Sequence, residues 1–154
     1  MSQMRAITTA LAAMSVSYTA EAGGTVTPTA YDVSALPTSV PAANLPVRLM
    51  GVTRGDSSAV LSPFTAGVND GQILHSFTEL CLIELVGLSR VADEWSDTMR
   101  YADALLAVLQ TNRGILARCE ITNANVQRGV FEYPNNSNEQ FYGCQTIISV
   151  MEIQ

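Results

Sequence analysis

Side chains that could carry out acid–base or nucleophilic chemistry are few in this chain and widely separated. His75 is the single histidine, and its neighbour Ser76 points to the opposite face if both lie in a strand. A hydrolase needs a nucleophile, a base and a group that orients the base, and no GxSxG segment supplies such a nucleophile. Phosphate-binding loops of the GxxxxGK[S/T] type require a lysine, which the chain lacks, and no GxGxxG segment is present. We therefore expect no catalytic residue, no cofactor-binding residue and no enzymatic activity.

The cysteines do not indicate a metal site. Cys81, Cys119 and Cys144 are widely spaced, and with His75 they form no CxxC or HxxxH pair. Each lies in an apolar or alternating segment, where a cysteine behaves as a small hydrophobic residue. The sequence thus predicts three reduced thiols in the core, with no bound metal.

The charged residues limit the classes of partner. All eight cations are arginines, charged residues make up 14% of the chain, and the net charge is −6. No cluster of arginines is present to neutralise phosphates, so we expect no open nucleic-acid-binding face. So few charges suggest that part of the surface is covered by other subunits. The arginine bias also has a simpler explanation, a genome rich in G and C.

Two helices follow from the apolar spacing. Met4, Ile7, Leu11 and Met14 recur every three or four residues, which predicts a helix over residues 3–17. Residues 1–22 imitate a secretory signal, but polar residues interrupt the apolar stretch. We therefore expect this segment to form a helix of the mature protein and not a cleaved signal. A second helix is predicted from Asp93 or Ser96 to Asn112, with acidic side chains at its positive N-terminus. Its expected buried stripe is Met99, Ala102, Leu105, Leu106 and Leu109.

Strand patterns occupy most of the remaining chain. We predict a short strand over residues 46–52, a turn at Arg54-Gly55-Asp56, a weaker strand over 58–61 and a long strand over 72–86. In the long strand Phe77, Cys81, Ile83 and Leu85 should share one face, with Leu80, Leu82 and Val86 on the other. Three more strands are expected over residues 115–121, 125–133 and 140–153, the last two joined by an asparagine-rich turn. No apolar run approaches the length of a membrane-spanning helix.

Residues 19–46 form a proline-rich arm in this prediction. Four prolines and Gly23-Gly24 prevent a helix and an interior strand. We expect an interface with a neighbouring subunit or stacked ring protein. It would be formed by the apolar residues along the arm and by the terminal strand, which is apolar on both faces. These interface residues are Tyr31, Val33, Leu36, Val40, Leu45, Ile148 and Val150.

Together these elements predict one α+β domain over residues 1–154. A mostly antiparallel sheet of about four to six strands should pack against two helices, with the arm at residues 19–46 extended. Neither a disulfide nor a metal is needed for a chain of this length to form a core.

The order of these elements resembles that of tail terminators of tailed bacteriophages, the neck rings that cap the tail tube. Val130-Phe131-Glu132-Tyr133 and Phe141-Tyr142-Gly143-Cys144, running into residues 147–153, are similar to the closing hairpin of that family. The resemblance implies a non-enzymatic homohexameric ring between the tail tube protein and the head–tail connector, with DNA passing through its lumen without specific binding. It also implies location in the virion after assembly in the host cytoplasm. The arm at residues 19–46 departs from the shorter members of the family.

Two alternatives remain open from the residues. The first is another neck, head–tail joining or minor capsid protein, which would share the interface-rich surface. The second is a small-ligand-binding α+β domain, which would be a monomer with an apolar pocket.

Overall fold

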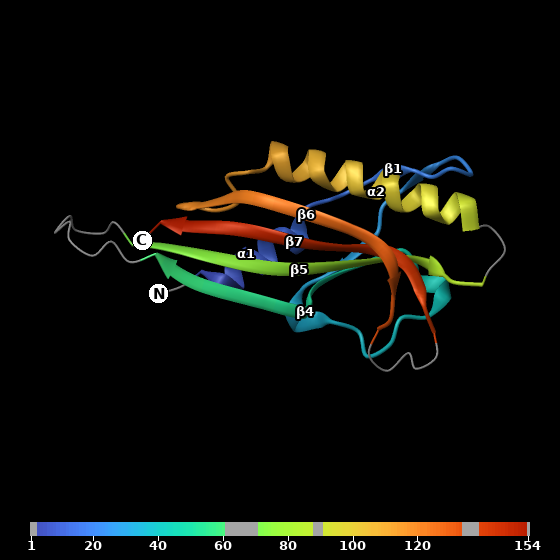
Figure 1. The fold of residues 1–154 in the computed structure, drawn as a ribbon, viewed down its shortest axis with the longest axis horizontal. Coiled ribbons are helices and arrows are strands. Elements are labelled where there is room, and N and C mark those ends of the chain that lie inside the picture. Colours follow the sequence, from blue (N-terminus) through green and yellow to red (C-terminus); the bar gives the residue numbers. More distant parts are fainter. Residues whose placement is uncertain (1–2, 61–70, 88–90, 134–138, 154) are drawn as a thin grey trace.

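The computed structural model of the protein describes residues 3–60, 71–87, 91–133 and 139–153 (Figure 1). It confirms an α+β fold with two helices and a mostly antiparallel five-stranded sheet. The elements in chain order are α1 (Met4–Ala13), β1 (Tyr18–Thr19), β2 (Thr25–Val26), β3 (Thr29–Tyr31), the 3-10 turns η1 (Val33–Ala35) and η2 (Ala42–Asn44), β4 (Val47–Val60), β5 (Gln72–Leu85), α2 (Val91–Thr111), β6 (Cys119–Phe131) and β7 (Phe141–Ile153).

The main sheet has the strand order β3-β4-β5-β7-β6. Among the strands that the structure describes, only the short strand β3 pairs in parallel, and it does so with the first three residues of β4. The long strands β4, β5, β7 and β6 alternate in direction. The strands β1 and β2 form a separate two-stranded ribbon at the start of the arm.

Both helices pack on one face of the sheet and form the first core with it. α1 contributes Ile7 and Leu11, α2 contributes Tyr101 and Leu105, and the sheet contributes residues such as Phe77. α1 is shorter than the predicted helix over residues 3–17, because Met14 has extended backbone (φ −68°, ψ 127°). The chain then runs along the core, where Val16 and Tyr18 are buried. Figure 1 shows α2 running alongside β6.

The arm builds a second core on the other face of the sheet. Val40 is fully buried there against Leu80 and Leu82 of β5, and Leu36 and Leu45 pack around the same cluster. The arm is therefore folded onto its own domain. Its prolines are compatible with this path because β3 is an edge strand.

Three strand predictions are corrected at places where the strand pairing is irregular. Residues 54–56 lie within β4, which continues across an irregularity between Met50 and Gly55 in place of the predicted turn. The predicted strands over 115–121 and 125–133 are replaced by one strand, β6, which begins at Cys119 and has an irregularity between Ile121 and Asn123. An irregularity between Leu82 and Glu84 moves Leu85 to the second core, away from the face of Phe77. The predicted asparagine-rich turn, residues 134–138, lies outside the described residues.

Candidate interaction surface

A buried cluster of polar side chains lies between the sheet and both helices. The guanidinium of Arg48, on β4, donates to both carboxylate oxygens of Glu79 on β5, at 3.1 Å from Nε and 2.9 Å from Nη2. It also donates to the carbonyls of Leu11 and Met14 at the end of α1. The hydroxyl of Tyr101, on α2, donates to Glu79 from the other side.

The surroundings of this cluster favour a charged Arg48 and a neutral Tyr101. Burial alone lowers the pKa of Arg48, but the charge of Glu79 and its hydrogen bonds outweigh burial and raise that pKa above its ordinary value. Burial is the main cause that raises the pKa of Tyr101 well above its usual range, and the negative charge of Glu79 is the second. Both ionisable partners are almost inaccessible to solvent. The cluster joins α1, α2 and the sheet and presents no group to a substrate.

His75 lies in a second buried pair. Its Nε2 is 2.8 Å from Oε2 of Glu152 at the end of β7, and the backbone N–H of Gln3 donates to the same carboxylate oxygen at 3.2 Å. Histidine and glutamate are both buried. The pair therefore fixes the start of α1 against the sheet. No group of three or more metal-ligating side chains occurs among the residues that the structure describes.

The three thiols lie in the core, and none forms a disulfide. Cys81 and Cys144 face each other across β5 and β7, and the Cys144 thiol donates to the carbonyl of Thr98 on α2. Burial raises the pKa of Cys144 to about 12 and that of Cys81 well above its ordinary value. Burial also raises the pKa of Cys119. Protonated thiols of this kind are packing residues and weak nucleophiles.

The structure corrects the predicted interface for three residues. Ile148 and Val150 are completely buried in the first core, because their face of β7 lies beneath the helices. Val40 is buried in the second core, so it contacts its own sheet. None of these three side chains is accessible to another subunit.

The other four predicted interface residues keep some exposure. Tyr31, Leu36 and Leu45 are half-buried against the second core. Val33 is 39% exposed at the edge of the sheet, where its side chain lies beside Gly51.

Two residues of the predicted buried stripe, Met99 and Leu106, lie exposed on α2, whereas Leu105 and Leu109 are buried as predicted. Met99 and Leu106 are 45% and 40% exposed, whereas Tyr101, Leu105 and Leu109 form the buried face of the helix. Trp95 continues the stripe toward the start of α2 and is 37% exposed. Two neighbouring apolar stripes on one helix look alike in sequence, so spacing alone could not tell which one is buried.

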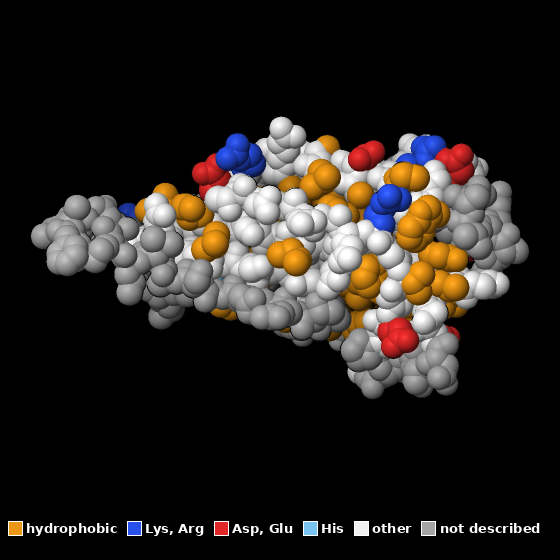
Figure 2. Space-filling view, viewed as in Figure 1, with side chains coloured by type: hydrophobic (Ala, Val, Ile, Leu, Met, Phe, Trp, Pro, Cys, Tyr) orange, Lys and Arg blue, Asp and Glu red, His pale blue; other side chains and the backbone are white. Residues whose placement is uncertain are grey.

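The seam between α2 and β6 extends this apolar surface. Trp95 packs edge-to-face on Tyr142, with ring centroids 6.0 Å apart, and the guanidinium of Arg128 lies 5.5 Å from the Trp95 ring centroid. Val130, on β6, is 46% exposed. Figure 2 shows hydrophobic side chains gathered beside arginine on this side of the molecule. We call Trp95, Met99, Leu106, Arg128 and Val130 the α2/β6 seam.

A groove of about 350 Å³ continues the seam toward the end of α2. It is lined by Leu106, Leu109, Gln110, Arg113 and residues 121–124. The groove is wide open to solvent, whereas pockets for small molecules bury most of the ligand surface. Its shape fits an extended protein surface better than an enclosed small ligand.

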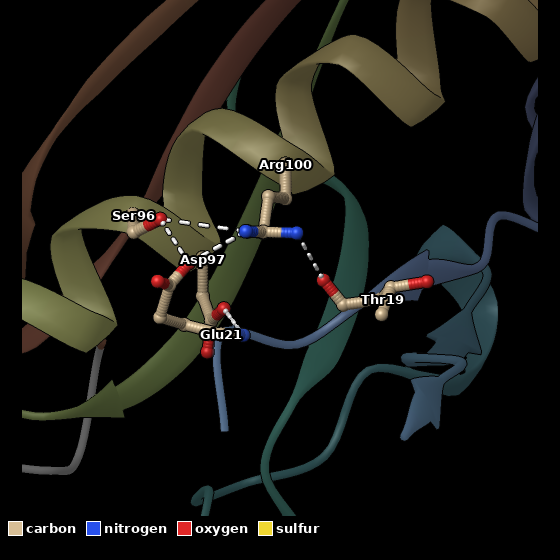
Figure 3. Close-up of polar contacts among 5 residues, drawn as sticks. All are labelled: Thr19, Glu21, Ser96, Asp97 and Arg100. Atoms are coloured by element: carbon tan, nitrogen blue, oxygen red, sulfur yellow. Dashed lines mark hydrogen bonds and ion pairs between the residues drawn. The ribbon is translucent and has the colours of Figure 1, made fainter. Parts of the chain in front are cut away.

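The start of the arm is tied to α2 by exposed polar contacts (Figure 3). Arg100 forms an ion pair with Glu21 at 2.6 Å and donates to the carbonyl of Thr19. Ser96 donates to the same carboxylate, and Asp97 accepts from the backbone N–H of Glu21. The hydrogen bond from Ser96 lowers the pKa of Glu21 most, and the hydrogen bond and positive charge of Arg100 lower it further. Helix α2 begins at Val91, so Ser96 positions the arm and does not cap the helix.

Comparisons with known proteins identify no family. No family model matches the chain, and neither a curated protein nor a solved structure is similar to it. Neither helix of the described chain is both long and apolar enough to cross a membrane.

Proposed function

We propose that the protein is a ring-forming structural component of a phage tail, a tail terminator that caps the tail tube and joins it to the head connector. The order of elements supports this proposal. An opening helix, a series of strands, a second helix and a closing hairpin of β6 and β7 follow one another in the order that the family resemblance implies, although β4 and β5 are long where short strands were expected.

The α2/β6 seam is the observation that carries the proposal. Its apolar side chains are exposed together along one side of the protein, beside an open groove. Exposed apolar side chains grouped on one side are typical of protein–protein interfaces, in which tryptophan and arginine are enriched. The buried polar clusters, in contrast, bind the helices to the sheet and expose no reactive group.

Strands β6 and β7 supply a surface suited to passing DNA. Residues 122–127 of β6 and 145–151 of β7 contain no charged side chain. Asn125, Gln127, Gln145 and Ile147 lie together on the sheet face opposite the helices and line a shallow hollow. A neutral face on a protein with net charge −6 has no cations to hold phosphates, so it would let DNA slide past.

Locating the protein in particles tests this function. Gold-labelled antibody against the chain should mark the junction between head and tail, in several copies for each particle. Label on the capsid shell, or a single copy for each particle, would contradict the proposal. A monomer in dilute solution is compatible with it, because ring closure can require the tail tube as a template.

A further inference from the structure

The main sheet ends on two long edges that no other strand covers in the described part of the chain. One is β6, the last strand in the sheet order. The other is β4 after Leu49, because β3 pairs only with Val47, Arg48 and Leu49. Exposed strand edges present unpaired N–H and C=O groups that can pair with another chain.

The directions of the strands make these two edges complementary. Four long strands alternate in direction between the edges, so β4 and β6 of one copy run antiparallel to each other. If copies are placed side by side in the same orientation, β6 of one copy runs antiparallel to β4 of the next. The alternation then continues across the boundary, in the more stable type of ladder.

The two edges also lie at the same level along the strands. Val60 of β4 pairs with Gln72, which pairs with Ile153 near the start of β6. At the other end, Val47 lies in one row with Gly129 through β5 and β7. The uncovered part of β4, residues 50–60, is therefore level with the first two thirds of β6.

The matching part of β6 lacks the features that protect edge strands. Residues 122–127 contain no proline and no charge, although natural edges are commonly blunted by lysine, proline or an inward charge. The loop before β6 covers only its beginning, where the N–H of Ile121 donates to the carbonyl of Arg113 at 2.8 Å.

The helices would meet across the same boundary. α1 packs over β4 and α2 over β6 and β7, on one face of the sheet. Side-by-side copies would bring α1 and η1, with the exposed Met4 and Val33, toward the α2/β6 seam. The eight residues of β6 that are level with this edge, 119–126, span about 26 Å, and a sheet layer plus a helix layer is about 20 Å deep. The contact would then bury on the order of 500 Å² on each copy, less than the roughly 800 Å² of a standard interface, so a ring would need several such contacts or a template to close.

We infer that copies of this protein join head to tail, with β6 of one copy adding as a strand to the uncovered edge of β4 in the next. The inference rests on the proposed function for ring closure and names the contact that builds the ring. A head-to-tail contact uses two different surfaces, and it gives a ring when the rotation from one copy to the next closes and an open filament when it does not.

Disulfide trapping tests this contact. Asn125→Cys on β6 is combined with one cysteine on β4, Asp56→Cys, Ser58→Cys or Val60→Cys. The three positions test different alignments of β6 in one copy against β4 in the next. Within one copy β5 and β7 separate these positions by about 14 Å, beyond the roughly 7 Å that a disulfide allows. Any disulfide between them therefore joins two copies. The protein is oxidised in the presence of tail tubes and separated by denaturing electrophoresis, while electron microscopy scores rings independently.

At least one double variant should give a ladder of covalent oligomers beyond the dimer. Asn125→Cys alone should give none, because head-to-tail copies keep their β6 strands apart. Efficient dimers from Asn125→Cys alone would show symmetric pairing of two β6 strands and overturn the inference. Rings without any cross-linked ladder would overturn the contact and leave the proposed function standing. A ladder without rings would support the contact and contradict the ring.

Discussion

Replacing Arg48 with methionine should destabilise the folded chain strongly. Arg48→Met removes the partner of a carboxylate that is fully buried and leaves Glu79 with the hydroxyl of Tyr101. It also removes the hydrogen bonds to the last carbonyls of α1. Breaking a buried ion pair in this way costs about 3–5 kcal/mol. For a chain of this size, about 1 kcal/mol lowers Tm by roughly 2–4 °C, so a fall of roughly 6–20 °C is expected.

The double variant Arg48→Met/Glu79→Leu is the matched control. It removes both charges, so the remaining cost comes from the hydroxyl of Tyr101 and the helix carbonyls that lose their partners, about 1–3 kcal/mol. Urea unfolding followed by circular dichroism at neutral pH gives the free energies of all three proteins. A single variant that costs less than about 1 kcal/mol, or a double variant less stable than the single one, would refute the buried-pair account.

Three further predictions concern the surface, the arm and the thiols. Leu106→Asp should reduce assembly and leave the free energy of unfolding almost unchanged, whereas Leu105→Ala should cost about 2–5 kcal/mol; sedimentation and urea unfolding distinguish the two effects. Val40→Ala should destabilise the monomer by roughly 1.5–3 kcal/mol because the side chain is buried, while Val33→Ala should change stability by less than about 0.5 kcal/mol; equal effects would contradict the second core. The raised pKa of Cys144 means that the folded state keeps its proton longer than the unfolded state, so its contribution is fully present below the ordinary thiol pKa and is lost as pH rises toward about 12. In that window unfolding should become easier by about 1.4 kcal/mol for each pH unit and each such thiol, and Cys144→Ala should flatten the slope of an alkaline stability curve.

Periodic apolar patterns predicted much of the architecture. The long strand around Phe77, the helix preceding Gly114 and the terminal strand were found close to their predicted bounds. Local composition was less informative where polar residues lie inside strands. Residues 54–56 resemble a turn, but pairing with β5 holds them in β4. Polar residues likewise interrupt the apolar pattern of β6, which pairs along its length with β7.

Functional surfaces were harder to predict because they depend on distant partners. Arg48 and Glu79 are 31 positions apart, and no local pattern indicates that they form a buried pair. The exposure of Met99 and Leu106 depends on the angle at which α2 meets the sheet. The burial of Val40 depends on the arm folding back over β5, whereas composition showed only that the arm is extended.

Imaging the protein at the end of a tail tube tests the central claim most directly. Electron microscopy of tubes assembled with this chain should show a closed ring of several identical copies with cyclic symmetry and an open central channel. The helices should lie outside and the neutral sheet face of Asn125 and Gln127 should line the channel. A single copy bound to the tube, or a chain that stays monomeric and binds no tube at any concentration, would contradict the account.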